Sequence, residues 1–232
     1  MKVAIMQPYF LPYIGYFQLI AAADLFIIYD NIKYTKKGWI NRNRLLSQGT
    51  DVVFTIPLAS DSDSLDIRER SLSENFHRDK MLNKFRESYR RAPHFPETFS
   101  LLQEILRFQD RNLFHFLRFS ISRTCLSLGI STEIRESSSF AIDHGLKGQD
   151  RVTALCEAAG ASTYINPIGG VGLYSREAFA AHGIELKFLR ATPLGYPQFD
   201  HDFVPWLSIV DVMMFNPPEA CQDLLRSFFE LN

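Results

Sequence analysis

Short apolar runs separated by turn residues predict strand, helix and strand at the start of the chain. The run VAIM at 3–6 stops at a Gln-Pro pair, which is typical of a buried strand. Apolar spacing over 14–23 favours a helix, and DLFIIYD at 24–30 predicts a second buried strand. Together they have the size of a βαβ unit with a right-handed crossover. DVVFTIPL at 51–58 predicts a further strand that a proline ends.

Residues 75–128 have helical apolar spacing and are rich in Phe and Arg. Pro93 and Pro96 separate a first helix from a second, because proline interrupts a helix interior. The apolar positions at this spacing are Phe76, Met81, Leu82, Phe85, Tyr89, Leu101, Leu102, Ile105, Leu106, Leu113, Phe116, Leu117 and Ile121. We therefore predict an insert of two or three helices over these residues.

Strands and helices alternate again in the second half of the chain. STEIRESSSF at 131–140 predicts a strand and a polar loop, and QDRVTALCEAAGA an amphipathic helix. STYINP then predicts a strand, IGGVGLY a glycine-rich loop, SREAFAAHG a helix with a Ser start and a Gly stop, and IELKFLRA a strand. This order is typical of a parallel, doubly wound sheet. The sequence thus predicts an α/β fold: one domain over 1–232 with a Rossmann-like, mostly parallel sheet and a helical insert.

Composition fits a globular protein and excludes several classes. Hydrophobic residues make up 46% of the 232 residues and charged residues 22%, which is ordinary for a packed core. A net charge of −1 provides no general attraction to nucleic acid or to an anionic membrane, so neither is the expected partner. Three widely spaced cysteines without a CxxC pattern fit a reducing cytoplasm. No signal peptide or membrane-spanning run is recognisable, so we expect a cytoplasmic protein without membrane insertion.

The stretch QPYFLPYIGYF at 7–17 places rigid aromatic surface where a strand meets a helix. The loop after the first strand of a parallel sheet lies at the carboxyl edge, where open α/β folds bind ligands. Two prolines stiffen the loop, and Gly15 permits close backbone approach at the helix start. The side chains that we predict to line a pocket here are Gln7, Tyr9, Tyr13 and Tyr16. The alternative is a proline-bracketed turn whose aromatic rings complete the core.

A basic and aromatic segment, NIKYTKKGWINRNR, follows at 31–44. Guanidinium and ammonium groups suit phosphate oxygens, and an indole suits a base or sugar face. We predict that Lys36, Arg42 and Arg44 neutralise phosphates and that Trp39 stacks on the ligand, with Asn41 beside them. A solvated basic loop with a half-buried Trp39 is the competing interpretation.

The stretch YINPIGGVGLY at 164–174 combines a strand, a glycine-rich loop and the start of a helix. Backbone N–H groups in such a loop favour negative charge, so it is a candidate anion cradle. The spacing is neither GxGxxG nor a Walker motif, so the pattern alone is weakly specific. The residues proposed for ligand contact are Asn166, Gly169, Gly170 and Tyr174.

Two aspartates stand out among the titratable residues. Asp30 ends the second strand at the carboxyl edge and is the candidate general base or substrate orienter, or else a turn cap. Asp211 lies inside the apolar run SIVDVMMF, where an unpaired carboxylate would be unfavourable, so it requires a partner. None of the six histidines has the spacing of a metal site, so no metal ligand is predicted and no cofactor is assigned.

Several segments together resemble the WbqC-like protein family. They are QPYFLPYIGYFQLI, DLFIIYDNIKYTKKGWINRNRLL, YINPIGGVGLY with GIEL after it, and YPQF with FVPWLSIVDVMMFN, spread over most of the chain. The resemblance implies a role in surface-polysaccharide and O-antigen biosynthesis, with chemistry on a nucleotide-activated sugar, but it assigns no catalytic residue. A looser similarity to HIGH-type nucleotidyltransferases would put Tyr13 and Tyr16 at histidine positions, which argues against adenylyl transfer because tyrosine does not supply the cation.

The leading hypothesis is a transferase that uses a nucleotide-linked sugar or acyl donor in cell-surface glycan assembly. A cluster of Arg and Lys without a nucleophile is compatible with such chemistry, because positioning and charge neutralisation supply most of the rate in phosphoryl or nucleotidyl transfer. The alternative is a non-catalytic scaffold of a polysaccharide assembly complex that docks through the insert. Use of tRNA or an aminoacyl donor is a weaker third hypothesis, suggested by the basic aromatic segment.

Overall fold

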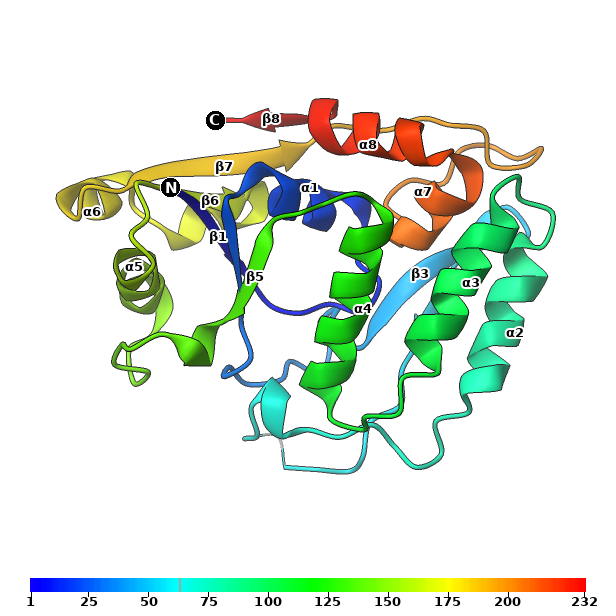
Figure 1. Cartoon of the computed structure of the whole chain (residues 1–232), viewed down its shortest axis with the longest axis horizontal. Coiled ribbons are helices and arrows are strands. Elements are labelled where there is room, and N and C mark those ends of the chain that lie inside the picture. The colour runs from blue at the N-terminus through cyan, green and yellow to red at the C-terminus, as the bar shows by residue number, and fades with distance from the viewer. Residues whose placement is uncertain (63) are drawn as a thin grey trace.

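The computed structural model describes residues 1–62 and 64–232, and it is built around one mixed sheet (Figure 1). The strand order is β5-β2-β1-β6-β7-β8; the first five strands are parallel and β8 is antiparallel to β7. The strands are β1 Lys2–Met6, β2 Leu25–Ile28, β5 Glu133–Glu136, β6 Thr163–Pro167, β7 Glu185–Ala191 and β8 Phe229–Leu231. The prediction of a Rossmann-like α/β fold with a mostly parallel sheet is confirmed.

Apolar side chains on both faces of the inner strands explain why β1 and β2 are continuous apolar runs. Successive side chains of a strand point to opposite faces. Accordingly Val3 and Ile5 contribute to one apolar cluster, whereas Ala4 contributes to the other. In β2, Phe26 and Ile28 belong to the same cluster as Ala4. A strand buried on both faces has no solvent side and so shows no polar alternation.

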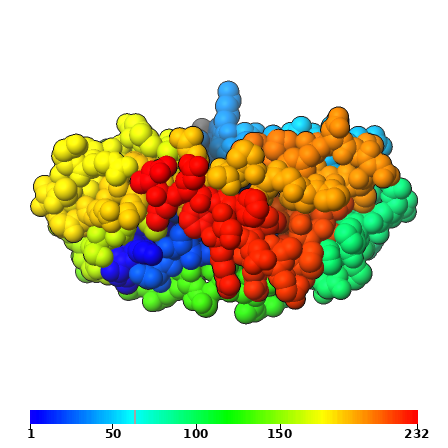
Figure 2. Space-filling view, turned by 90° about the horizontal axis from the view of Figure 1, so that it is seen from above, coloured from blue at the N-terminus to red at the C-terminus, as the bar shows by residue number. Residues whose placement is uncertain are grey.

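Helices cover both faces of the sheet. Helix α1 Ile14–Ala22 connects β1 to β2 and packs into the larger cluster, with α8 Pro218–Ser227 beside it. Helices α5 Gly148–Ala158 and α6 Arg176–Ala181 pack into the smaller cluster on the opposite face. Figure 2 shows α8 and the last residues, in red, over the middle of the face that it views. Helix α6 starts at an N-cap, Ser175, that accepts from the Ala178 N–H, as the sequence predicts.

The insert consists of three helices, α2 Arg78–Tyr89, α3 Phe95–Leu106 and α4 Leu113–Ser127. They lie at the opposite end of the molecule from α5 and α6 (Figure 1). Their buried residues belong to the same continuous apolar cluster as α1 and the sheet. Helix α7 Ile209–Phe215 packs against α3 in this region.

The segment after β2 forms a separate hairpin. Strand β3 Arg42–Ser47 pairs antiparallel with β4 Thr50–Thr55, so the strand predicted at 51–58 lies outside the main sheet. The short 3-10 helices are η1 Ile67–Glu69, η2 Ser137–Ser139 and η3 Ile168–Leu173. None of the helices in the described ranges combines the length and the apolar character needed to span a bilayer.

Candidate functional site

The largest cavity that we describe lies at the carboxyl edge of the sheet and encloses about 790 Å³. We call it the sheet-edge cavity. Its walls come from the ends of β1, β2 and β6, from η3 and from the start of α5. This is the crevice in which open α/β folds bind ligands, and its volume lies in the range of small-molecule sites.

Six of the predicted residues line this cavity. They are Gln7, Tyr9, Asn166, Gly169, Gly170 and Tyr174. Gly170 is required by close packing, because a Cβ there would lie 1.9 Å from the Asn166 amide nitrogen. The Tyr164 hydroxyl donates to the Asn166 side-chain oxygen over 2.9 Å and fixes that amide at the end of β6. The first and third sequence motifs therefore meet in one cavity.

The open helix N-terminus at this cavity belongs to α5. The sequence pattern placed the anion cradle at the helix after the glycine-rich loop, but Ser175 caps that helix. The glycine-rich loop itself forms η3. Helix α5 begins after Lys147 without a side-chain hydrogen bond to its cap, and both Lys147 and Gly148 line the cavity. Uncapped N–H groups and the helix dipole favour an anion at this point.

Within the described part of the chain, three cationic side chains line the same cavity, which the acidic Asp66 also lines. Arg151, one turn into α5, lines the cavity, and its guanidinium lies 5.4 Å from the centre of the Tyr29 ring. Its Nη2 donates to the Asn31 backbone oxygen over 3.1 Å, while its Nε is buried without a partner among the described residues. Lys33 and Lys147 add two exposed ammonium groups to the lining. The positive charge suits phosphate or carboxylate oxygens.

Three phenol rings complete the walls. Burial raises the pKa of Tyr9, Tyr29 and Tyr174 above the ordinary tyrosine value. These hydroxyl groups therefore remain protonated at neutral pH and act as neutral hydrogen-bond donors and ring faces.

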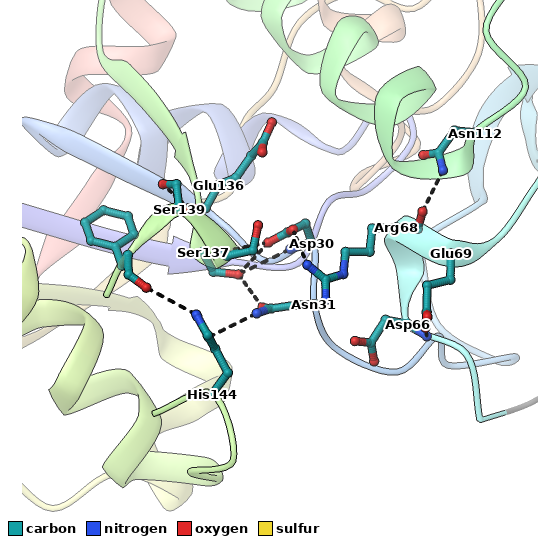
Figure 3. Close-up of polar contacts among 12 residues, drawn as sticks. Asp30, Asn31, Asp66, Arg68, Glu69, Asn112, Glu136, Ser137, Ser139 and His144 are labelled. Atoms are coloured by element: carbon teal, nitrogen blue, oxygen red, sulfur yellow. Dashed lines mark hydrogen bonds and ion pairs between the residues drawn. The ribbon is translucent and has the colours of Figure 1, made fainter. Parts of the chain in front are cut away.

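A chain of polar contacts runs from the cavity wall into the protein (Figure 3). The His144 Nδ1 lies 3.1 Å from the Asn31 amide nitrogen, and its Nε2 lies 3.2 Å from the Phe140 carbonyl oxygen. A carbonyl oxygen can only accept, so the imidazole tautomer with its proton on Nε2 satisfies both contacts. Ser137 Oγ lies 2.6 Å from Asn31 Oδ1 and 2.8 Å from Asp30 Oδ1.

Asp30 lies at the inner end of this chain and does not line the cavity. Its carboxylate is 3.7 Å from Arg68 Nη1 and accepts from the Ser138 N–H over 2.9 Å. The side chain is almost fully buried. Asp30 therefore reaches the cavity through Ser137 and Asn31, an arrangement that suits orientation of Asn31 and His144 more directly than proton abstraction from a ligand.

Four predicted residues meet in a second cavity of about 240 Å³. We call it the aromatic cavity; its walls are Tyr9, Pro12, Tyr13, Trp39, Asn43, Arg44 and Trp206. Tyr9 lines both cavities, so the two lie side by side. The guanidinium groups of Arg42 and Arg44 lie 5.5 and 5.6 Å from the Trp39 ring centre.

Five predicted ligand contacts line neither cavity. Tyr16 is buried, and its hydroxyl donates to the Gln7 carbonyl oxygen over 2.9 Å. Gly15 is the second residue of α1 and lies next to the Tyr13 ring, which occupies the space a Cβ would need. Asn41 is buried and donates to the Ile56 carbonyl, and Arg42 donates to the Gly38 carbonyl inside its own loop.

The fifth, Lys36, lies in the exposed part of the basic segment. Figure 2 shows light-blue atoms of the early chain projecting from the surface. The structure thus divides the predicted set between two cavities, the core and a solvated loop.

Sequence reasoning missed the residues that the segment 140–151 brings to the sheet-edge cavity. The sequence pattern assigned no role to His144, Lys147 or Arg151. A signal exists in KGQDR at 147–151: a lysine and a glycine precede an amphipathic helix with an arginine one turn in. Recognising it requires that the preceding strand, β5, be placed beside β2 in the parallel sheet.

The comparisons with known proteins support one family assignment. The chain is 32% identical over 229 residues to the uncharacterized protein Rv1507c of Mycobacterium tuberculosis (strain ATCC 25618 / H37Rv), covering 97% of both chains. No solved structure matches the chain. The model of the WbqC-like protein family matches residues 7–223. The chain therefore belongs to the WbqC-like protein family.

Proposed function

We propose that the protein is a transferase of cell-surface polysaccharide (O-antigen) biosynthesis that uses a nucleotide-linked sugar or acyl donor. The observation that carries this proposal is the meeting of the uncapped α5 N-terminus with Lys147 and Arg151 in the sheet-edge cavity. Membership of the WbqC-like family supports the biological context that its resemblance implies.

The arrangement suits a donor whose leaving group is a phosphate. In such a transfer the acceptor oxygen or nitrogen forms a bond to the reactive carbon of the donor. The bond from that carbon to phosphate oxygen breaks, the phosphate keeps the electron pair, and the acceptor proton passes to a base or to water. The α5 dipole and the nearby cations stabilise the negative charge that develops on the phosphate. The rings of Tyr29 and Tyr174 offer faces for the base or sugar of the donor.

Asp30, predicted as a general base or substrate orienter, is proposed to act indirectly, because it does not line the cavity. It acts through Ser137 on Asn31, whose amide contacts both His144 and Arg151. The proposal therefore assigns Asp30 the role of a positioning residue for the cation and the imidazole at the cavity wall.

The scaffold alternative receives less support from the insert. Its large aromatic side chains, such as Phe85 and Phe116, are buried in the core. Within the insert, which the structure describes completely, Leu126 is the large apolar side chain that is strongly exposed. A docking surface for a protein partner is normally richer in exposed aromatic residues.

The test is a binding screen of nucleoside diphosphates and nucleotide sugars by thermal shift and calorimetry. Lys147→Ala removes an exposed charge and is expected to weaken the binding of such a ligand by about tenfold or more. Arg151→Lys keeps the charge but replaces Nη2, which donates to both oxygens of Asn31, by an ammonium on a shorter side chain, and it is expected to weaken binding as well.

Arg107→Ala, an exposed arginine at the end of α3, is the matched control and is expected to leave binding unchanged. The proposal fails if no nucleotide stabilises the protein. It fails equally if a nucleotide binds with the same affinity to the Lys147→Ala and Arg151→Lys variants.

A further inference from the structure

We infer that the aromatic cavity binds the ring of a neutral carbohydrate and is the acceptor site next to the donor site. The term acceptor rests on the proposed function, whereas carbohydrate binding rests on the cavity alone. The cavity is formed by the proline-aromatic loop, the start of the hairpin and the segment that joins β7 to α7. That segment passes along the upper edge of the molecule in Figure 1 before it enters α7.

The walls are mostly ring faces. Tyr9, Tyr13, Trp39 and Trp206 all line a space of about 240 Å³, and the Tyr13 and Trp206 ring centres are 6.1 Å apart in an edge arrangement. This volume is below the roughly 300–1,000 Å³ of drug-sized ligand sites, so the space suits one sugar ring and not a nucleotide. The C–H face of a pyranose packs on an indole or phenol ring in the way other apolar rings do.

The phenol hydroxyls of Tyr9 and Tyr13 in this cavity are neutral hydrogen-bond donors. Burial raises the pKa of Tyr9 and of Tyr13, so both phenols remain protonated. Within 1–62 and 64–232, neither hydroxyl makes a hydrogen bond, although both side chains are mostly buried. Hydroxyl groups of a sugar would supply the missing partners.

The cation of the cavity is already neutralised. Arg44 Nη1 forms an ion pair with Asp51 over 3.2 Å, and its Nη2 donates to the Trp206 carbonyl oxygen over 3.0 Å. Asn43 is likewise engaged, because its amide donates to the Leu11 carbonyl and accepts from the Arg44 N–H. Among the described residues, Arg44 Nε has no partner, but both terminal nitrogens are engaged, so less positive charge is open to a phosphate or carboxylate here than at the sheet-edge cavity.

Trp206 is held in an unfavourable backbone conformation. Its φ is +60°, a left-handed value that a bulky side chain rarely adopts. The hydrogen bond from Arg44 holds its carbonyl, and the indole stays 47% exposed at the cavity rim. Trp39, which is 41% exposed, stands at the same cavity. Exposure of two indoles at one small cavity is the arrangement expected of a ligand platform and not of core packing.

The two tryptophans of the chain both line this cavity, so intrinsic fluorescence reports on it directly. The experiment titrates the full-length protein with methyl glycosides of glucose, galactose, mannose and N-acetylglucosamine. It records tryptophan emission and protection from acrylamide quenching. We expect at least one glycoside to shift the emission and to protect the indoles in a saturable manner.

Two variants test the contacts. Tyr13→Phe removes a hydroxyl that has no hydrogen-bond partner among the residues that the structure describes, so we expect unchanged thermal stability and about tenfold weaker glycoside binding. Trp39→Phe shrinks one ring face and leaves Trp206 as the reporter, and we expect weaker binding of a similar size. Lys147→Ala, at the other cavity, is expected to leave glycoside affinity unchanged while it weakens nucleotide binding.

The outcomes separate the two proposals. If nucleotides bind in a Lys147-dependent manner but no glycoside protects the indoles, the carbohydrate inference is overturned and the proposed function stands. If a glycoside binds but Tyr13→Phe and Trp39→Phe do not weaken it, the inference is also overturned. If glycosides bind through these residues and no nucleotide binds, the carbohydrate site stands and the donor proposal fails.

Discussion

Two almost fully buried carboxylates, Asp30 and Asp211, lie in different regions and have opposite surroundings. Asp30, at the sheet edge, has a guanidinium partner, Arg68, in addition to its hydroxyl and backbone contacts. Asp211, in α7, accepts from neutral groups, namely the hydroxyls of Tyr89 and Tyr196 and the Gln198 amide, at 2.6–2.9 Å.

The difference shows how one residue type serves two purposes. The Tyr89 hydroxyl also accepts from the Leu46 N–H, so the Asp211 cluster ties α7 to α2 and to the hairpin. The Asp30 cluster instead leads outward to Asn31 and His144 at the cavity wall. Buried polar networks that close on themselves define the fold, whereas those that open into a cavity position groups for a ligand. The comparison predicts that replacement of Asp211 mainly lowers stability, whereas replacement of Asp30 also lowers ligand affinity.

The largest effect is expected for Asp211→Ala. Removal of the carboxylate leaves three buried donors without an acceptor, so the free energy of unfolding should fall by about 3–4 kcal/mol. Nucleotide affinity of the folded fraction should not change, because the cluster is remote from the sheet-edge cavity lining. Urea unfolding measures the loss of stability, and calorimetric titration measures the nucleotide affinity. A loss of unfolding free energy smaller than about 1 kcal/mol, the size of one ordinary hydrogen bond, would contradict the structural role of Asp211.

The second prediction concerns pH. Burial raises the pKa of Asp211 from 3.8 to about 6, although the three donors oppose the shift. A raised carboxyl pKa means that the folded state holds the proton more tightly. The contribution of Asp211 to stability is therefore greatest below the unfolded value and is lost as pH rises from about 4 to about 6.5. The whole change is about 3 kcal/mol.

The measurement is urea unfolding of the wild type and of Asp211→Asn across this pH range. The stability of the wild type relative to the variant should decline with rising pH, because the variant lacks the titrating group. A difference that is flat, or that rises with pH, contradicts the assignment. Since removal of one member of a buried polar cluster leaves its partners unpaired, Asp211→Ala remains destabilising at neutral pH despite this slope.

A smaller stability effect is expected for Asp30→Asn. The variant keeps an acceptor for Ser137 and the Ser138 N–H but loses the ion pair with the half-exposed Arg68, so it should lose about 1–2 kcal/mol. Because the chain to Asn31 is perturbed, nucleotide affinity should fall several-fold. A variant that is destabilised but binds nucleotide as well as the wild type would assign Asp30 a purely structural role.

The smallest stability effect is expected for His144→Ala. The side chain is exposed, so unfolding free energy should change by no more than about 0.5 kcal/mol. Binding to the sheet-edge cavity should nevertheless weaken, because the imidazole lines it. His77→Ala, an exposed histidine that precedes α2, is the matched control and should alter neither quantity. Equal nucleotide affinities for the two variants would show that His144 does not contribute to ligand binding.

Much of the fold could be predicted because its signals are local. The apolar runs before Gln7 and Asp30 specify strands, and the proline and glycine positions mark where helices begin and end. The need of Asp211 for a partner also follows from its apolar neighbours and is confirmed by its three donors. The hairpin partner of β4 could not be predicted, because RNRLLS in β3 alternates too briefly to be distinguished from a polar loop.

The candidate site could be predicted in part. Position after a strand of a parallel sheet favoured Gln7, Tyr9 and Asn166, and these three residues line one cavity. The same argument failed to separate Tyr16, which packs inward, from Tyr9, since both lie in one loop and only packing decides which ring faces the cavity.

The sequence by itself determined most of the strands and helices and the parallel βαβ architecture, because burial periodicity and turn chemistry are properties of neighbouring residues. Its motifs indicated the family. Tertiary structure alone decided which side chains share a cavity. His144 and Arg151 reach Asn31 only because β5 pairs with β2, and Trp206 meets Tyr13 only because the segment after β7 returns to the hairpin. Contacts between residues more than a hundred positions apart depend on strand order and on the packing of layers, which no local pattern specifies.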